Sequence, residues 1–314
     1  MRMKRLGNSG LKVSVVGLGC NNFGMKIDQA ATDAVVAKAI DLGITLFDTA
    51  DVYGNKGGSE TMLGKALGAR RKDIVLATKF GLPMADGDLM KGGSRRYIMN
   101  AVDASLKRLG TDYIDLYQMH FPDPDTPIEE TLAALDALVR SGKVRYIGSS
   151  NFAGWQLTEA WYIANERNLT KFVSAQNHYN LLDRKIEQEL VPAAKAYGAS
   201  ILPYFPLASG MLTGKYRRGA DLPNDGRLTQ WGERGKSILS DANFDLVEKL
   251  TAFAEARGHS LLDLAIGWLA SQPHVGSVIA GATKPEQVEQ NVKAGAWELD
   301  AEELAEVSMM SFRF

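Results

Sequence analysis

The chain has 314 residues, of which 45% are hydrophobic and 23% charged, and its formal net charge of -1 at pH 7 completes a balance typical of globular proteins with a sizeable core. This near-neutral charge argues against a nucleic-acid partner, and the single cysteine, Cys20, excludes an internal disulfide and cysteine-cluster metal sites. Because the N-terminus is not followed by an apolar leader and no run of about 18 apolar residues occurs, we expect a cytoplasmic protein without a membrane partner.

The first predicted element is a β-hairpin over residues 3–13, with its turn at Gly7-Asn8-Ser9-Gly10. Eight short apolar runs rich in β-branched residues recur through the chain, and most begin about 30 residues apart, the length of one strand–helix repeat. They lie at residues 13–18, 45–47, 74–78, 113–119, 144–148, 172–175, 200–203 and 275–279. Eight such strands close a barrel, so we predict an α/β fold with one domain over residues 1–314, a (β/α)8 TIM barrel whose lower end the hairpin closes.

Three glycines near the N-terminus, Gly17, Gly19 and Gly24, superficially match the dinucleotide fingerprint G-x-G-x-x-G. Asn22 occupies the third glycine position, and the next helix is predicted only from about Asp28. The geometry that cradles a phosphate in that motif is therefore not expected. We predict instead a loop beside the mouth of the barrel.

Two segments farther along the chain carry clear local signals. Thr126-Pro127-Ile128-Glu129 predicts a helix N-terminus with a capping box and a first-turn proline, and Gly142 predicts the end of that helix. The largest irregular stretch follows the seventh strand, from Gly214 to about Lys236, and includes Asn224 and Asp225. A loop of this length inside a compact domain is usually functional or mobile.

Polar side chains stand at the C-terminal end of six predicted strands, on the face where (β/α)8 barrels carry their active sites. A single polar residue there would mean little, because polar residues commonly begin loops, but six in turn indicate a site. These residues are Asp48, Thr78-Lys79, His120, Ser149-Ser150-Asn151, Gln176-Asn177 and Tyr204.

Four residues near this face form a plausible set for carbonyl reduction. Tyr53 lies five residues after Asp48, so its phenol is expected to lean over the barrel mouth, where the Lys79 ammonium would stabilise a phenolate and lower the pKa. Asp48 is the expected counter-charge for Lys79. His120 would donate a hydrogen bond to the substrate oxygen while Tyr53 supplies the proton, and the hydride would come from a cofactor.

Longer motifs resemble a known family. Phe47-Asp48-Thr49-Ala50-Asp51-Val52-Tyr53-Gly54, followed by Ser59-Glu60 and Leu63-Gly64, resembles the aldo-keto reductase signature. Three further segments resemble the cofactor-contact segments of that family in order and spacing, namely 147–151, 204–216 and 281–291. The resemblance covers nearly the whole chain and implies an oxidoreductase that moves a hydride between NADP(H) and a small carbonyl or alcohol substrate.

By this resemblance, the catalytic tetrad consists of Asp48, Tyr53, Lys79 and His120, with Tyr53 as the general acid or base. The resemblance also implies that Ser150, Asn151 and Gln176 hold the carboxamide and that Tyr204 stacks on the nicotinamide ring. The other implied cofactor contacts are Pro206, Leu207, Gly210, Leu212, Lys215, Gly281, Thr283, Lys284, Gln287 and Asn291.

The segment after the eighth strand is the expected phosphate site. Thr283 to Glu286 predicts a capping box, a helix N-terminus binds anions readily, and Lys284 adds positive charge. The resemblance implies NADP(H) as the cofactor, with NAD(H) less expected, and the preference is reduced because Gln287 stands where many relatives carry arginine. Phe205 stands where the Tyr-Ser-Pro-Leu segment of the family has serine.

Two other functions are consistent with the same residues. One is a regulatory subunit that senses NADPH and turns over slowly, and the other is a lyase that uses Lys79 as a Schiff-base nucleophile. No metal site is predicted, because the four histidines are dispersed and unaccompanied by cysteines. The sequence leaves the substrate, the physiological direction and the oligomeric state open.

Overall fold

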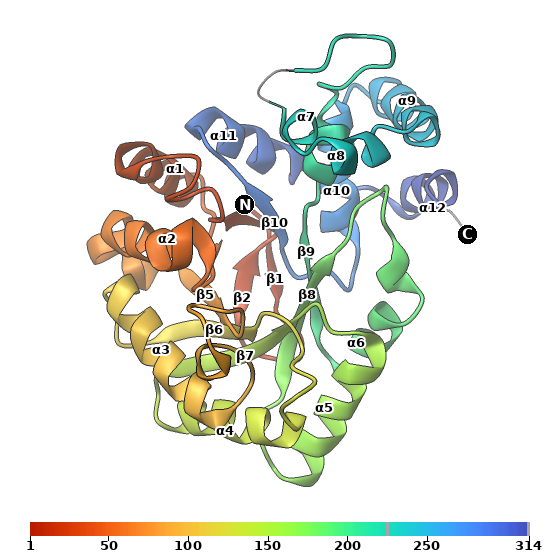
Figure 1. The fold of residues 1–314 in the computed structure, drawn as a ribbon. Coiled ribbons are helices and arrows are strands. Elements are labelled where there is room, and N and C mark those ends of the chain that lie inside the picture. Colours follow the sequence, from red (N-terminus) through yellow and green to blue (C-terminus); the bar gives the residue numbers. More distant parts are fainter. Residues whose placement is uncertain (224–225, 313–314) are drawn as a thin grey trace.

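The structure, a computed structural model, describes residues 1–223 and 226–312 (Figure 1). Its main sheet has eight parallel strands in the order β10-β3-β4-β5-β6-β7-β8-β9. Ile201 of β9 pairs in parallel with Val275, just ahead of β10, and this contact brings the two edges of the sheet together. The strands are β3 (Val16–Gly19), β4 (Leu46–Asp48), β5 (Val75–Phe80), β6 (Ile114–Met119), β7 (Val144–Ser150), β8 (Phe172–His178), β9 (Ser200–Tyr204) and β10 (Val278–Gly281). The predicted (β/α)8 barrel is confirmed.

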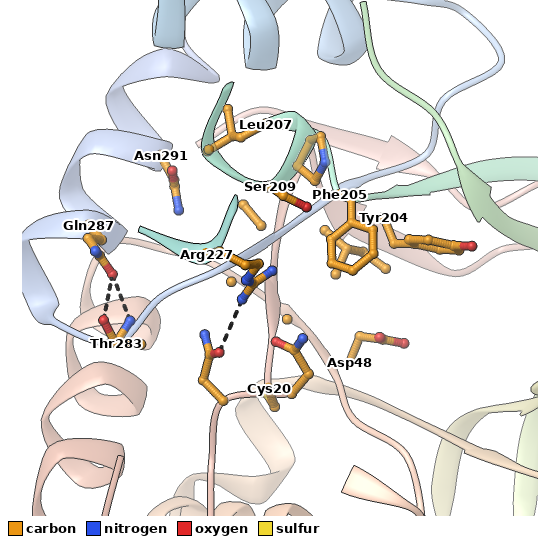
Figure 2. Close-up of a pocket in the computed structure, with 18 of the residues that line it drawn as sticks. Cys20, Asp48, Tyr204, Phe205, Leu207, Ser209, Arg227, Thr283, Gln287 and Asn291 are labelled. Atoms are coloured by element: carbon orange, nitrogen blue, oxygen red, sulfur yellow. Dashed lines mark hydrogen bonds between the residues drawn. The ribbon is translucent and has the colours of Figure 1, made fainter. Parts of the chain in front are cut away.

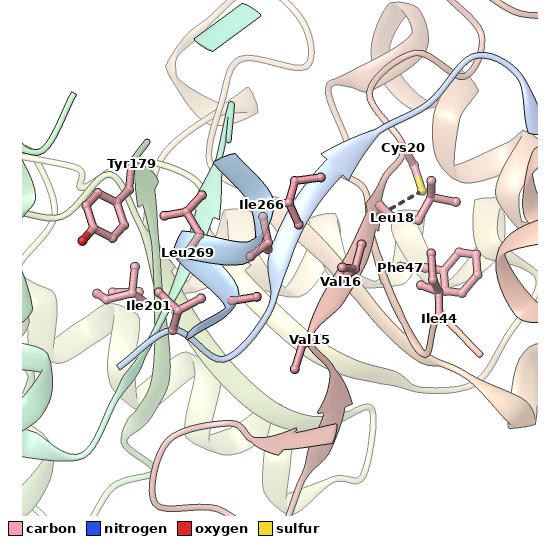
Figure 3. Packing of buried hydrophobic residues seen from close by; sticks show 14 of the residues in the cluster. Val15, Val16, Leu18, Cys20, Ile44, Phe47, Tyr179, Ile201, Ile266 and Leu269 are labelled. Carbon is pink, nitrogen blue, oxygen red and sulfur yellow. Dashed lines mark hydrogen bonds between the residues drawn. The ribbon is translucent and has the colours of Figure 1, made fainter. Parts of the chain in front are cut away.

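Helices connect successive strands and surround the sheet (Figure 1). The helices that follow β3 to β8 in turn are α1 (Gln29–Asp41), α2 (Tyr53–Leu67), α3 (Arg95–Leu109), α4 (Ile128–Arg140), α5 (Gly154–Glu166) and α6 (Leu190–Tyr197). Between β9 and β10 lie α7 (Arg227–Gln230), α8 (Glu233–Ile238), α9 (Asp241–Glu255) and α10 (Leu261–Ser271), and after β10 come α11 (Pro285–Ala294) and α12 (Ala301–Met310). The main hydrophobic core fills the space between sheet and helices, as Val16 and Leu18 of β3, Ile201, and Ile266 and Leu269 of α10 illustrate (Figure 3).

The N-terminal hairpin pairs β1 (Met3–Arg5) with β2 (Lys12–Ser14), as predicted. Leu6 and Val13 are fully buried and share a second apolar cluster with barrel residues such as Leu46 and Leu202. The hairpin therefore closes one end of the barrel.

The predicted strand over residues 13–18 is wrong in one respect, because it is divided between β2 and β3. The break falls at Val15, and the preceding serine stabilises it. The Ser14 hydroxyl donates to the carbonyl oxygen of Val16 at 2.6 Å, while the backbone N–H of Ser14 donates to the Thr45 hydroxyl at 2.9 Å. These bonds turn the chain from the hairpin into the barrel.

The local helix signals are only partly confirmed. Helix α1 follows an Asp28 cap, as expected for the late start after the glycine-rich segment, and Gly142 with φ +80° lies just past the end of α4. The capping box predicted at Thr126 is wrong: Pro127 is the N-cap, without a side-chain hydrogen bond. The Thr126 hydroxyl instead donates to Asp123, three residues earlier, at 2.7 Å, so a local side chain binds the group that the motif assigned to the helix.

After β9 and a short 3-10 helix (Ala208–Thr213), the predicted irregular stretch is indeed irregular from Gly214 through residue 223, but its last part is helical. Asn224 and Asp225, two members of the predicted irregular stretch, lie outside the described residues. Leu228, within α7, is buried, and its backbone N–H donates to the Tyr216 hydroxyl at 3.0 Å, which anchors the helical part to the chain before it. This segment lies beside the C-terminal end of the barrel strands (Figure 1).

Over residues 1–223 and 226–312, no helix combines the length and the apolar character that crossing a membrane requires. The same described residues contain no cluster of three or more histidine, cysteine or acidic side chains that could hold a metal ion.

Candidate active site

A cavity of about 1000 Å³ opens at the C-terminal ends of the barrel strands (Figure 2). It collects nearly all of the predicted site residues on one surface. The predicted residues that line it are Asp48, Tyr53, His120, Ser150, Asn151, Gln176, Tyr204, Pro206, Leu207, Gly210, Lys215, Gly281, Thr283, Lys284, Gln287 and Asn291. The two that do not are Lys79, which is buried in the wall, and Leu212, which is part of the core.

The base of the cavity holds a buried ion pair. Lys79 is fully buried, and its Nζ donates to Asp48 Oδ2 at 2.6 Å and to the carbonyl oxygen of Thr49 at 2.9 Å. Burial alone lowers the pKa of Lys79, but the Asp48 carboxylate and the Tyr53 hydroxyl outweigh it, so the net pKa lies above the ordinary value. Lys79 is therefore a fixed ammonium ion.

Asp48 is held from its other side by two glutamines. Its Oδ1 accepts hydrogen bonds from Gln118 Nε2 and Gln176 Nε2, each at 2.9 Å. Gln118 was missed in the sequence because it lies inside a predicted strand rather than at its end. The available signal was a polar residue two positions after Leu116, on the same face of the strand as that buried apolar side chain, where burial requires a hydrogen-bond partner.

Tyr53 begins α2 and leans over this ion pair. Lys79 Nζ lies 5.1 Å from the centre of the Tyr53 ring, and the next residue, Gly54, has φ +68°, where a Cβ would collide with Ser59 and Phe23 backbone atoms. Burial raises the pKa of Tyr53, and the charge and hydrogen bond of Lys79 lower it by less, so the net pKa lies above its ordinary value of 10.0. The Lys79 ammonium acts on the pKa in the expected direction, but desolvation outweighs it.

His120 lies beside Tyr53, at the same end of the cavity as the ion pair. Its ring is in edge contact with Tyr53 at 5.7 Å between ring centres, and it stacks on Phe121. Burial, with a smaller contribution from Lys79, lowers the pKa of His120 to about 3. The imidazole is therefore neutral at pH 7 and offers one N–H donor rather than a positive charge.

One wall of the cavity is a chain of hydrogen bonds across β7, β8 and β9. The Tyr204 hydroxyl donates to Asn151 Oδ1 at 2.7 Å, and Asn151 Nδ2 donates to the carbonyl oxygen of His120 at 2.9 Å. The Ser150 hydroxyl donates to the carbonyl oxygen of Gln176 at 2.9 Å. These contacts fix the predicted carboxamide-binding residues relative to His120.

The far end of the cavity is cationic. Lys26, Lys215, Arg227 and Lys284 line it, whereas among the described lining residues Asp48 is the single acid. Burial lowers the pKa of Lys26, and the like charges of Arg227 and Lys215 lower it further; burial also lowers the pKa of Arg227. A group of cations at one end of a cavity, with no acid among the described residues beside it, is suited to bind an anion.

Lys26 and Arg227 were missed in the sequence, since no local motif surrounds them. Both lie on loops that the predicted fold placed near the barrel mouth, one after the first strand and one after the seventh. Only the folding of the chain brings the loop after β3 and helix α7 to the same cavity, where Arg227 donates a long hydrogen bond of 3.4 Å to Asn22.

The start of α11 differs from the predicted capping box. Lys284 is the N-cap, with no side-chain cap, and Pro285 occupies the first turn. The backbone N–H and the hydroxyl of Thr283 both donate to Gln287 Oε1, at 2.7 and 3.1 Å (Figure 2). Gln287, one residue farther along the helix, thus accepts the hydrogen bonds of Thr283 that the motif assigned to Glu286. Gln287 also lines the cavity.

A second buried carboxylate, Asp51, lies behind Tyr53 and gives a testable stability prediction. Burial and the charge of nearby Glu60 raise the pKa of Asp51, and Arg108 lowers it by less, so the net pKa is about 7. Because the folded-state pKa of Asp51 lies above its unfolded value near 4, the protonated carboxyl contributes stability at pH values below about 4. This contribution is lost as the pH rises through 7. Asp51→Asn should therefore raise the free energy of unfolding at pH 8, by up to about 4 kcal/mol, and change it little at pH 4.

Denaturant unfolding at both pH values tests this prediction. Asp123→Asn is the matched control, because backbone and Thr126 hydrogen bonds lower the pKa of Asp123 despite its partial burial, so this variant should be destabilised at pH 8. Equal stability of wild-type protein and Asp51→Asn at pH 8 would show that Asp51 is not held in a charged, desolvated state.

Known proteins resemble this chain over nearly its whole length. The profile of the Aldo/keto reductase family matches residues 15–311. Over 301 residues, the chain is 40% identical to a probable voltage-gated potassium channel subunit beta of Oryza sativa subsp. japonica, covering 94% of this chain and 91% of the relative. It is 38% identical over 312 residues to the uncharacterized oxidoreductase YrpG of Bacillus subtilis (96% and 93% covered) and 36% identical over 305 residues to an L-glyceraldehyde 3-phosphate reductase of Escherichia coli (94% and 87% covered). Since both the profile and these relatives extend over nearly the whole chain, the protein belongs to the aldo/keto reductase family.

Proposed function

We propose that this protein is an NADP(H)-dependent reductase of small carbonyl compounds, with Tyr53 as the general acid or base. The observation that carries the proposal is the group formed by Tyr53, His120 and the buried Lys79–Asp48 pair at one end of a cavity whose other end is cationic. We further propose that residues 1–314 act as one domain, in the cytoplasm.

The lining of the cavity fits a nicotinamide dinucleotide. Its volume of about 1000 Å³ is in the upper range of ligand sites, and its cations are suited to the phosphates. Gln176 is bonded to Asp48, and Ser150 and Asn151 are bonded to the backbone of Gln176 and His120, so these neutral groups lie at the end of the cavity that holds Tyr53 and are suited to a carboxamide. Asp48, the one acid among the described lining residues, is neutralised by Lys79, so it does not repel an anionic ligand.

In this proposal, the bound cofactor supplies or accepts the hydride. The neutral His120 donates its N–H to the carbonyl oxygen and orients the substrate. Tyr53 gives its proton to the same oxygen, and the raised pKa keeps its hydroxyl protonated at pH 7, as the reductive direction requires. Lys79 then stabilises the phenolate, and Asp48 holds the ammonium in place.

A panel of aliphatic, aromatic and sugar aldehydes and ketones, supplied with NADPH or NADH, tests this function. We expect NADPH consumption with at least one carbonyl and a lower KM for NADPH than for NADH. Lack of turnover across the panel, together with tight NADPH binding, would contradict the enzymatic proposal.

Arg227 should dominate binding of the cofactor phosphates. Arg227→Ala is expected to raise the Kd for NADPH by about 10- to 100-fold at low salt, since a charge-assisted hydrogen bond contributes about 1.5–3 kcal/mol. The rate at saturating NADPH should stay within a factor of about three. Arg218→Ala is the control, because Arg218 is exposed on the same segment and pairs with Asp241 and Glu248 away from the cavity. Titration of NADPH fluorescence measures both, and equal Kd values for the two variants would place the phosphates elsewhere.

A second candidate function is a regulatory subunit that senses NADPH. The observation that favours it is the similarity to proteins named as probable channel beta subunits, from rice and from Arabidopsis thaliana. The two candidates differ in turnover, because a sensor would bind NADPH tightly and reduce every carbonyl of the panel slowly.

The structure argues against a Schiff-base lyase. A nucleophilic lysine must be deprotonated and reach the substrate. Lys79 does neither, because the Asp48 carboxylate keeps it charged and its side chain is fully buried. Borohydride in the presence of substrate is therefore not expected to trap an adduct on Lys79.

A further inference from the structure

Phe205, directly after β9, has a backbone conformation that bulky residues rarely adopt. Its φ is +51°, in the left-handed region, where a side chain without local hydrogen bonding is strained. Two hydrogen bonds to its carbonyl oxygen hold this conformation, one from Asn180 Nδ2 and one from the backbone N–H of Ala208, each at 3.0 Å. Such strain is maintained by the surrounding structure, and it sets the direction in which the ring points.

The ring of Phe205 joins the barrel to the long segment that follows it. On the barrel side, it makes edge contacts with Tyr204 and His178, at 5.3 and 5.8 Å between ring centres. On the other side, it makes an edge contact with Trp231 at 6.1 Å, and the Arg227 guanidinium carbon lies 5.7 Å from the ring centre. Figure 2 shows the ring between Tyr204 and Arg227.

Arg227 has few other groups to hold it. It begins α7, a helix of four residues, and among the described residues the one hydrogen bond of its guanidinium group is the 3.4 Å bond to Asn22. In the described part of the chain, no carboxylate forms an ion pair with it. The face of an aromatic ring attracts a guanidinium group, so the Phe205 ring is a direct means of fixing its position.

From these contacts we infer that Phe205 is a positioning residue for cofactor binding: its ring fixes Arg227 at the cationic end of the cavity and so sets the affinity for the phosphate groups of the ligand. This inference rests on the proposed function, because it assumes that the cavity binds a phosphate-bearing cofactor. Phe205 itself takes no part in proton or hydride transfer.

A double-mutant cycle tests the inference. Phe205→Leu keeps apolar volume and removes the aromatic face, and we expect it to raise the Kd for NADPH about 5- to 10-fold and to weaken its salt dependence. The rate at saturating NADPH should not change. In an Arg227→Ala background, the same substitution should change the Kd less than about twofold, because the group that it positions is absent. Phe205→Tyr keeps the aromatic ring, so its Kd for NADPH should equal that of the wild-type protein.

A Phe205→Gly variant and a pyrophosphate probe separate the proposed role of the ring from unfolding and from the choice of cofactor. Phe205→Gly relieves the strain at φ +51° while removing the ring, so it should fold and show the same loss of affinity even where Phe205→Leu is unstable. Inorganic pyrophosphate is used as a second probe, in competition with NADPH and alone in thermal shift. Wild-type protein that binds pyrophosphate but not NADPH would overturn the proposed cofactor and leave the link between Phe205 and Arg227 measurable. Equal effects of Phe205→Leu with and without Arg227, or no effect at all, would overturn the inference.

Discussion

Tyr53→Phe should lower kcat for NADPH-dependent carbonyl reduction by about 10²- to 10⁴-fold, the usual contribution of a positioned general acid. Phenylalanine keeps the ring against His120 and above Lys79 but has no proton to give. The Kd for NADPH should stay within about twofold of wild type, because the cationic end of the cavity is unchanged. Steady-state kinetics with the best substrate of the panel and a fluorescence titration of NADPH measure the two quantities.

Tyr162→Phe is the matched control for this substitution, because Tyr162 is exposed on α5 and lies outside the cavity, so its loss of a hydroxyl should leave kcat unchanged. The pH profile of the wild-type protein gives an independent check. The raised pKa of Tyr53 keeps the acid protonated at neutral pH, and the pKa of about 3 for His120 leaves no inflection near 6.5. A Tyr53→Phe variant that retains more than about a tenth of wild-type kcat would assign the proton to another group.

Lys79→Met should abolish most activity and also destabilise the fold. The substitution leaves the Asp48 carboxylate buried without its counter-charge, at a cost of about 3–5 kcal/mol in the free energy of unfolding. It also removes the cation that stabilises the Tyr53 phenolate, so kcat should fall by at least about 100-fold. Denaturant unfolding at pH 7 and steady-state kinetics measure these effects.

The double variant Asp48→Asn, Lys79→Met separates the two consequences. Both charges are then absent, and the amide group that replaces the carboxylate keeps an acceptor oxygen for Gln118 and Gln176, so much of the stability should return. Activity should not return, because the ammonium beside Tyr53 is still missing. Recovery of activity in the double variant would mean that Lys79 acts in folding alone.

The barrel was predictable because its signals are local and repeated. Each strand is a short β-branched run between turn residues, and a period of about 30 residues repeated eight times admits few arrangements other than a closed parallel sheet. The polar residues Asp48, Lys79 and His120 were found for the same reason, since the C-terminal ends of the strands in such a barrel meet at one face. The cap motifs at Thr126 and Thr283 failed because a nearby side chain offered another partner: Asp123, three residues before Thr126, accepts from one hydroxyl, and Gln287, four residues after Thr283, accepts from the other.

The sequence by itself determined the eight-stranded barrel, the face that carries the site and the ionisable residues that meet there, since each depends on periodicity and on strand ends. The tertiary structure decided the rest: the net direction of the pKa of Tyr53, the two glutamines on Asp48, and the approach of Lys26, Arg227 and Phe205 to one cavity. The physical reason is that desolvation and electrostatic interactions depend on distances between residues far apart in the chain, and no local pattern encodes those distances.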